Sequence, residues 1–139
     1  MDSSATENSL RNNPTWTFVC VKEDIAWHAE EHGIAPVMQL LSKNPELLRD
    51  AWIEDRVVGK AAALLFVFGQ IKSLHAELIS EYAIEVLSGT KIALSYDRMV
   101  PYIMNRNKTG ACPMEETVRL VNNPEIAYEM LQNKLRGGV

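Results

Sequence analysis

The first apolar stretches of the chain are short, rich in β-branched and aromatic residues, and separated by a polar turn. Thr15 to Lys22 and Ile25 to Glu30 both have this character, which is typical of β-strands. Glu23-Asp24 between them has the length and polarity of a two-residue hairpin turn. The pattern therefore predicts an antiparallel hairpin at the start of the domain.

Longer segments after the hairpin repeat apolar residues at helical spacing. From Ile34 to Asp50 this spacing predicts a helix, which Asn44-Pro45 interrupts so that a second short helical piece follows. Ala51 to Asp55 has the pattern of a short extended segment. Arg56 to Phe68 contains an Ala-rich apolar run, which predicts a helix that is buried on several faces and is closed by Gly69.

The second half of the chain alternates between strand-like and helix-like segments. Ser80 fits the N-cap of a helix that Ser88-Gly89 ends. Strands that alternate with helices form parallel sheets, so we predict an α/β fold with a mixed sheet, helices on both faces and the hairpin at its start. The remaining elements are expected as strand, helix, strand, helix and helix, at Ile71 to Ile79, Glu81 to Leu87, Ile92 to Tyr96, Glu115 to Val121 and Pro124 to Leu135.

Composition narrows the class of protein. With 139 residues, 47% of them hydrophobic, the chain fits one domain, which we place at residues 15–139 after a loosely held tail at residues 1–14. The net charge of −4 and the lack of a long Lys/Arg cluster argue against a nucleic-acid or anionic-lipid partner. The longest apolar run, Ala61 to Phe68, is too short to span a bilayer. We expect a reduced cytoplasmic protein in which Cys20 packs inside a strand and no disulfide is needed.

Lys60 stands at the first turn of the Ala-rich helix, near free backbone N–H groups and the positive end of the helix dipole. A cation there is unfavourable unless an anion joins it. Asp55 is one candidate for that anion, and a bound carboxylate or phosphate is another. The plain alternative is a surface ion pair between Lys60 and Asp55 or Glu54.

Cys112 precedes Pro113, which suits the first position of a helix and places the thiol at the N-cap. A thiol in such a position, near a basic side chain, tends toward the reactive thiolate. Glu115 is then either a general base or an ordinary first-turn acid. Upstream, Asn105 and Arg106 lie in a polar loop of a type that often binds ligands.

The tripeptide His-Ala-Glu occurs at His28 and again at His75, and the second copy precedes Cys112-Pro113 in the order known from zinc deaminases. Such an enzyme needs two further thiolate ligands, with the Glu as proton shuttle. Here Glu115 stands where the second thiolate is needed. Both copies also fall in expected strands, whereas the deaminase motif opens a helix.

Four short motifs occur in a fixed order along the chain. The order is similar to that of an uncharacterised bacterial family of small domains with a cytidine-deaminase-like fold, over residues 15–121. The motifs are Asp55-x-Val57-Val58-Gly59-Lys60-Ala61-Ala62-Ala63, Ser80-Glu81, Val100-Pro101-Tyr102-Ile103-x-Asn105-Arg106 and Cys112-Pro113-Met114-Glu115.

This resemblance implies a three-layer α/β/α sandwich. It also implies that the helix opening at Gly59-Lys60 corresponds to the helix that carries the deaminase His and Glu. Ser80-Glu81 corresponds to the start of the helix that carries the two deaminase cysteines. Neither place holds a zinc ligand set here, so the resemblance implies a deaminase scaffold without zinc deaminase chemistry, and fold analogy supplies no substrate.

We therefore expect a polar pocket at the helix N-termini that takes a small anionic or nucleoside-like ligand, without a metal or cofactor. In an enzyme, Cys112 would be the nucleophile, Lys60 the electrostatic stabiliser, and Asp55 or Glu115 the general base. The further ligand-binding candidates are Ser80, Glu81, Tyr102, Asn105 and Arg106. Two other classes remain open, namely a divergent zinc-dependent deaminase of nucleosides or bases, and a non-catalytic assembly domain that acts as a homodimer.

Overall fold

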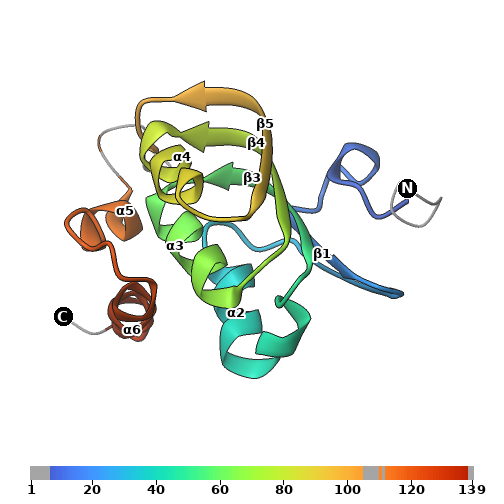
Figure 1. Ribbon diagram of the computed structural model, residues 1–139, viewed down its shortest axis with the longest axis horizontal. Helices are drawn as coiled ribbons and strands as arrows, with labels where there is room; N and C mark the ends of the chain where they lie inside the picture. The colour runs from blue at the N-terminus through green and yellow to red at the C-terminus, as the bar shows by residue number, and fades with distance from the viewer. Residues whose placement is uncertain (1–6, 105–109, 111, 138–139) are drawn as a thin grey trace.

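A computed structural model describes residues 7–104, 110 and 112–137 of the chain (Figure 1). Five strands and five α-helices follow one another, with two short 3-10 turns. In chain order the elements are η1 (Leu10–Asn12), β1 (Phe18–Lys22), β2 (Ile25–Ala29), α2 (Ala35–Lys43), η2 (Pro45–Leu47), β3 (Trp52–Val58), α3 (Lys60–Gly69), β4 (Ser73–Ser80), α4 (Glu81–Ser88), β5 (Ala93–Val100), α5 (Pro113–Thr117) and α6 (Pro124–Leu135).

The five strands form one mixed sheet in the order β2-β1-β3-β4-β5. β1 is antiparallel to both β2 and β3, whereas β3, β4 and β5 run parallel to one another. Glu23 adopts a positive φ of 55° in the tight turn between β1 and β2, as such short hairpin turns require. The predicted hairpin and mixed sheet are thus confirmed.

The helices lie on one side of this sheet, which differs from the expected sandwich with helices on both faces. Helix α3 contacts α2, α4, α5 and α6 (Figure 1). The steps from β3 to β4 and from β4 to β5 go in the same direction, so two right-handed crossovers place α3 and α4 on the same face. In the described part of the chain, the opposite face carries only the segment around η1 (Figure 1).

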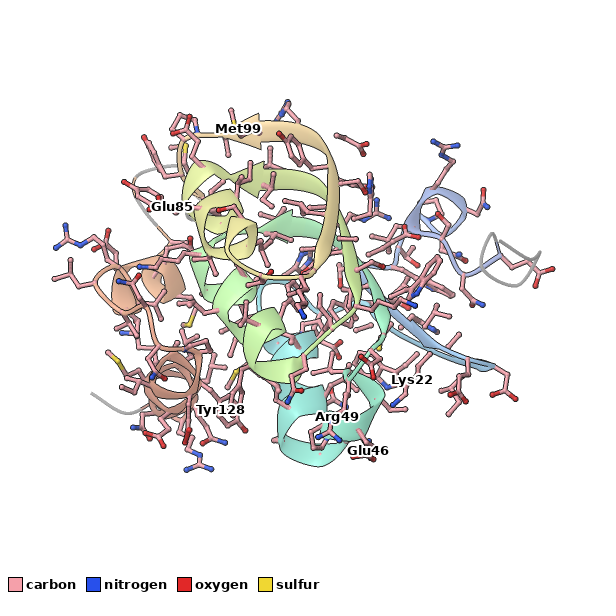
Figure 2. All side chains as sticks on the ribbon, viewed as in Figure 1. Lys22, Glu46, Arg49, Glu85, Met99 and Tyr128 are labelled. Carbon is pink, nitrogen blue, oxygen red and sulfur yellow. The ribbon has the colours of Figure 1, made fainter. Side chains whose placement is uncertain are left out.

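Helix α3 is the centre of the core, and residues 61–66 are all buried in it. The prediction of a helix buried on several faces is confirmed, because α3 lies between the sheet and the outer helix α6. Phe68 of α3 stacks on Tyr128 of α6 with ring centroids 5.2 Å apart, at the edge of the molecule where Figure 2 labels Tyr128. At the other end of the core, Lys22 and Glu46 lie close together in Figure 2, and the Lys22 ammonium donates to the Glu46 carbonyl.

Helix α3 begins at Lys60, four residues later than the sequence predicted. Arg56 to Val58, expected within the helix, extends β3 and pairs with β4. Asp55 and Val58 are buried while Arg56 and Val57 are not, so the alternation of inward and outward residues shifts by one position there. Because of this shift, residues 56–58 do not match the strict alternation by which a strand is predicted from sequence.

Residues 7–14, expected as part of a loose tail, are held against the sheet. Leu10 is only 3% exposed. Its backbone N–H and the Ser9 hydroxyl both donate to the Glu54 carboxylate of β3, at 3.1 and 3.3 Å. We call residues 7–14 the N-terminal segment.

Cys20 packs beneath the sheet, as expected. It is 2% exposed, and burial raises the pKa of its thiol to about 12 in spite of the nearby Lys22 ammonium, which lowers it. The thiol lies 3.3 Å from the Leu47 carbonyl oxygen. No helix among the described residues has the length and apolar character needed to cross a membrane.

Candidate functional site

The start of α3 meets the start of α5, although 55 residues separate the groups that touch. The Glu115 carboxylate accepts hydrogen bonds from the backbone N–H groups of Lys60 and Ala61, at 2.7 and 2.8 Å. Cys112 is the N-cap of α5 and Pro113 is its first residue, as predicted. We call Gly59, Lys60, Cys112 and Glu115 the helix-start site.

A carboxylate therefore already lies where the sequence suggested a bound anion. The helix dipole and the free N–H groups of the first turn favour a negative charge there. Burial raises the pKa of Glu115, and the two backbone hydrogen bonds from Ala61 and Lys60 partly offset that rise. The helix-start site is thus filled by the protein's own side chain.

Gly59 makes this contact sterically feasible. A Cβ atom at this position would lie 2.4 to 2.7 Å from the three atoms of the Glu115 carboxylate. The absence of a side chain at Gly59 lets the carboxylate approach the helix end. The glycine is therefore required by the position of Glu115.

Lys60 forms no ion pair with Asp55 or Glu54, the plain alternative from the sequence, in the part of the chain that the structure describes. The Lys60 ammonium donates to the Arg119 carbonyl oxygen at 2.9 Å. Asp55 is 7% exposed, and burial raises its pKa well above the ordinary range, while hydrogen bonds from the backbone N–H groups of Arg56 and Val57 lower it. Asp55 thus accepts hydrogen bonds from the backbone of its own strand, at the point in β3 where the alternation of buried and exposed residues shifts.

The other predicted site residues have separate settings. The Ser80 hydroxyl is fully buried and caps α4 by accepting from the Ala83 N–H at 3.1 Å. Glu81 is exposed in the first turn of α4, and Tyr102 is exposed after β5. Cys112 is half-buried, and Asn105 and Arg106 lie outside the described residues.

Both His-Ala-Glu copies lie at strands, as expected. His28 and Ala29 are in β2, and all three residues of the second copy are in β4. Within the described ranges, no three His, Cys, Asp or Glu side chains lie close enough together to hold a metal ion. The residues present therefore do not fit a deaminase zinc centre.

A cavity of about 760 Å³ lies on the sheet face that the helices leave uncovered. Its floor is formed by β1, β3, β4 and β5, and the N-terminal segment forms one wall. We call it the open-face pocket. Its lining residues are Asn8, Ser9, Arg11, Asn12, Val19, Val21, Trp52, Ile53, Glu54, Ser73, Leu74, His75, Glu77, Ala93, Leu94, Ser95 and Asp97.

Strand register arranges the floor of this pocket in rows that run across the sheet. One row is largely apolar and contains Trp52, which is 46% exposed. The two following rows are polar, because every second residue of β3, β4 and β5 points to this face. In the order β1, β3, β4, β5 the first two rows are Val21, Trp52, Ser73, Ala93 and Val19, Glu54, His75, Ser95. Two residues farther along β3, β4 and β5 stand Arg56, Glu77 and Asp97, which form the third row.

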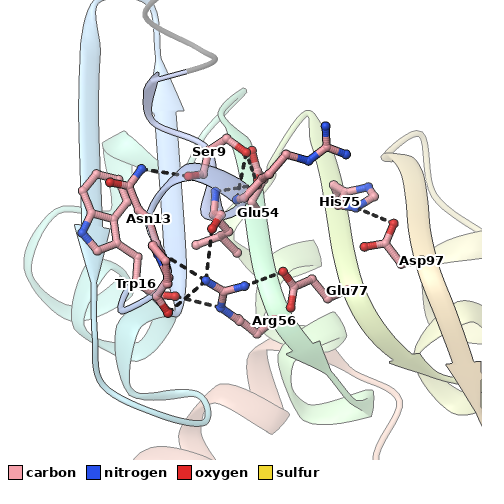
Figure 3. Close-up of polar contacts among 11 residues, drawn as sticks. Ser9, Asn13, Trp16, Glu54, Arg56, His75, Glu77 and Asp97 are labelled. Atoms are coloured by element: carbon pink, nitrogen blue, oxygen red, sulfur yellow. Dashed lines mark hydrogen bonds and ion pairs between the residues drawn. The ribbon is translucent and has the colours of Figure 1, made fainter.

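Arg56 ties the third row to the N-terminal segment (Figure 3). Its guanidinium forms an ion pair with Glu77 and donates to the carbonyl oxygens of Leu10, Asn13 and Trp16. Charged groups with several partners hold geometry better than single surface pairs do. Arg56 therefore fixes the segment that forms the wall of the pocket.

His75 lies between two partners on the neighbouring strand. Its Nδ1 atom is 2.8 Å from the Ser95 hydroxyl, and its Nε2 atom is 3.3 Å from the Asp97 carboxylate, the contact that Figure 3 shows. The side chains of His75 and Asp97 are 39% and 65% exposed, so both face the solvent of the pocket. One ring nitrogen therefore lies next to a hydroxyl and the other next to an acid.

Comparison with known proteins places the chain in a family. The family described as TM1506, a domain of unknown function (DUF1893), matches residues 6–135. The chain belongs to the DUF1893 family. The crystal structure of a DUF1893 family protein (TM1506) from Thermotoga maritima is similar over 96% of this chain and 92% of that one, with a TM-score of 0.84 and 21% sequence identity. Among curated proteins, the comparison finds no significant match.

The DUF1893 match agrees with the expected family of unknown function and supports the fold, but it assigns no activity. It also begins at residue 6, so it includes the N-terminal segment. Sequence reasoning missed the open-face pocket. The available signal was the row of polar residues at every second position of the expected strands, Ser73, His75 and Glu77 among them.

Proposed function

We propose that this DUF1893 protein binds a small planar ligand with amino or ammonium groups in the open-face pocket, on a deaminase-like scaffold that lacks zinc deaminase chemistry. The observation that carries the proposal is a half-exposed Trp52 on the same concave sheet face as three carboxylates. Nucleoside-like molecules belong to this class of ligand, because they combine a flat ring with exocyclic amino groups.

Trp52 supports the planar part of the ligand. A large aromatic ring that remains 46% exposed in a cavity has a free face against which a flat ring can stack. The neighbours of Trp52 on the same row, Val21 and Ser73, are small enough to leave that face accessible. Stacking of one base on an aromatic side chain is worth about 1–3 kcal/mol.

The charges around the pocket favour a donor rather than an anion. Glu54, Glu77 and Asp97 contribute three carboxylates to the lining, and Arg11 contributes a guanidinium. Glu77 is neutralised by its ion pair with Arg56 of β3, so Glu54 and Asp97 carry the excess negative charge. Acidic side chains accept hydrogen bonds from amino groups and repel phosphate or carboxylate ligands. The proposed ligand therefore differs from the anion suggested by Lys60 alone.

The helix-start site supports a structural role. Glu115 occupies the two N–H groups that an anionic ligand would use, and the Lys60 ammonium is bonded to the Arg119 carbonyl. A ligand there would have to displace a charged, bidentate contact. We assign this site to the attachment of α5 on α3.

The test is a titration of the purified full chain with adenosine and with cytidine, followed by tryptophan fluorescence and by the thermal unfolding midpoint. We expect at least one of the two to quench fluorescence and raise the midpoint. Trp52→Ala should weaken binding about fivefold to 150-fold, which corresponds to the 1–3 kcal/mol of stacking.

The matched control is Tyr82→Ala, because Tyr82 is an exposed aromatic residue on α4, away from the pocket. It should bind as the wild type does. Equal binding by wild type and Trp52→Ala, or no binding of either nucleoside, would refute the proposal. Cys112→Ser, which changes only the helix-start site, should leave the ligand-induced thermal shift intact.

A further inference from the structure

Ser95, His75 and Asp97 lie side by side across β4 and β5, on the floor of the open-face pocket, with His75 hydrogen-bonded to Ser95 and 3.3 Å from the Asp97 carboxylate. His75 lies directly opposite Ser95 in the strand register, and Asp97 is two residues farther along β5 on the same face. All three side chains come from strands rather than loops, so the sheet fixes their spacing. Reactive groups held in this way are already oriented before a ligand arrives.

The contacts give each group a chemical role. In the tautomer with the proton on Nε2, 3.3 Å from the Asp97 carboxylate, Nδ1 of His75 carries a lone pair that faces the Ser95 hydroxyl at 2.8 Å. The imidazole is then a base for the serine proton, and the carboxylate stabilises the imidazolium that forms. This division of roles is that of a serine nucleophile with a histidine base and an acidic partner, with the two ring nitrogens exchanged.

We propose that Ser95 is an acyl-accepting nucleophile, that His75 is its general base, and that the substrate is a small ester with an aromatic or heterocyclic group. This inference rests on the proposed function, since Trp52 and Ser95 line the same pocket and the stacking face of Trp52 would hold the flat group there. Arg11, which also lines the pocket, supplies a positive charge toward the oxygen that becomes negative in the reaction. Asp97 is a positioning residue, because it acts through His75.

The step balances without an oxidant or cofactor. The Ser95 oxygen forms a bond to the carbonyl carbon while its proton moves to Nδ1 of His75. The bond from that carbon to the alcohol oxygen then breaks, and the alcohol leaves with the proton from His75. Water attacks the acyl-serine in the same way, which releases a carboxylic acid and returns the proton to Ser95.

The experiment uses the full chain with p-nitrophenyl acetate and, separately, with a fluorophosphonate probe, followed by peptide mapping by mass spectrometry. We expect release of nitrophenolate and a single covalent adduct on Ser95. Ser95→Ala should abolish the adduct, and His75→Gln should slow its formation at least about a hundredfold, the lower range for a lost general base. Asp97→Asn should lower kcat while KM stays the same.

Two controls address general reactivity. Ser42→Ala on α2 and His32→Gln after β2 change exposed residues outside the pocket and should leave both reactions unchanged. Ser95→Cys retains a nucleophile and should still be acylated, which separates a chemical loss from a folding defect. Absence of an adduct on Ser95, or equal turnover by wild type and Ser95→Ala, would overturn the inference.

The two proposals fail in different ways. If Trp52→Ala loses nucleoside binding and the wild type forms no covalent adduct, the proposed ligand site is supported and the proposed role of Ser95 is refuted. If the Ser95 adduct forms equally fast in the wild type and in Trp52→Ala, and no nucleoside binds, Ser95 is supported as a nucleophile and the proposed planar ligand is refuted.

Discussion

The helix-start site and the open-face pocket lie on opposite faces of the sheet and differ in how their polar groups are satisfied. At the helix-start site, Glu115 fills the end of α3, and Gly59 leaves room for nothing larger than a hydrogen. In the pocket, the Asp97 side chain is 65% exposed and Trp52 is half-exposed. The comparison teaches that the residues with the strongest sequence signal secure one helix to another, whereas the pocket is built from ordinary strand positions.

The largest expected effect tests how tightly the helix-start site is filled. Gly59→Ala places a methyl group within 2.4 to 2.7 Å of the Glu115 carboxylate. Overpacking and disturbed hydrogen bonds together should lower the free energy of unfolding by about 3 kcal/mol, measured by chemical denaturation. Gly89→Ala is the control, because nothing lies within 4 Å of its added Cβ and its φ is −87°. Equal stabilities of the two variants would show that Glu115 does not need the space at Gly59.

Removal of the carboxylate itself should have the next largest effect. Glu115→Ala leaves the N–H groups of Lys60 and Ala61 without their acceptor and should cost about 2 kcal/mol of unfolding free energy. Glu116→Ala is the matched control, since its side chain is exposed and its ion pair with Arg119 spans 4.0 Å. It should change stability by less than about 0.5 kcal/mol. A smaller loss in Glu115→Ala than in Glu116→Ala would contradict the assignment.

The pH dependence of Glu115 gives a second measurement at the same place. Burial raises its folded pKa above the ordinary value of 4.5, so the folded state holds this proton more firmly than the unfolded chain does. The stability from this proton is present below pH 4.5 and is lost as pH rises through the folded pKa. The stability of the wild type relative to Glu115→Gln should therefore fall as pH increases over that interval, followed by urea unfolding at each pH. A rise instead would mean that the hydrogen bonds outweigh burial.

On the open face, the expected effect is smaller and more local. Glu54→Ala removes the acceptor that holds Ser9 and the Leu10 N–H, in a partly exposed setting. We expect a cost of about 1 kcal/mol and faster amide hydrogen exchange at residues 9–11, with little change in the helices. Glu85→Ala on α4 removes an acid that lies away from the N-terminal segment and serves as the control. Unchanged exchange in Glu54→Ala would show that Arg56 alone holds the segment.

The smallest effect concerns the reactivity of the two cysteines rather than stability. Iodoacetamide at pH 8 should alkylate half-buried Cys112 first, because Cys20 is 2% exposed and burial raises its pKa to about 12. Peptide mapping with time distinguishes the two sites. Alkylation of Cys20 before Cys112 in the folded protein would contradict the packing beneath the sheet.

Local signals in the sequence predicted several elements well. Ser80 caps α4, Gly89 follows its last residue, and α6 runs from Pro124 to Leu135 as expected. Cys112 and Pro113 also begin α5 as the sequence indicated. Capping at a helix end depends on neighbours in sequence, so a single chain reveals it.

Long-range contacts were not predictable in the same way. The polar N-terminal segment looks loose in sequence because its partners, Glu54 and Arg56, are some 45 residues away. The order of strands and helices along the chain also does not determine which face of the sheet the helices cover, since that depends on the direction in which successive strands are added to the sheet. The face of β3, β4 and β5 that holds His75 was therefore expected to lie under helices.

Arg56 carries a practical consequence for work with this protein. One guanidinium gathers carbonyl oxygens from Leu10, Asn13 and Trp16 and at the same time neutralises Glu77. An affinity tag fused just ahead of residue 7 would lie next to this set of contacts, on the wall of the open-face pocket. A purification tag is therefore better placed after α6, which lies on the opposite side of the molecule from the N-terminal segment (Figure 1).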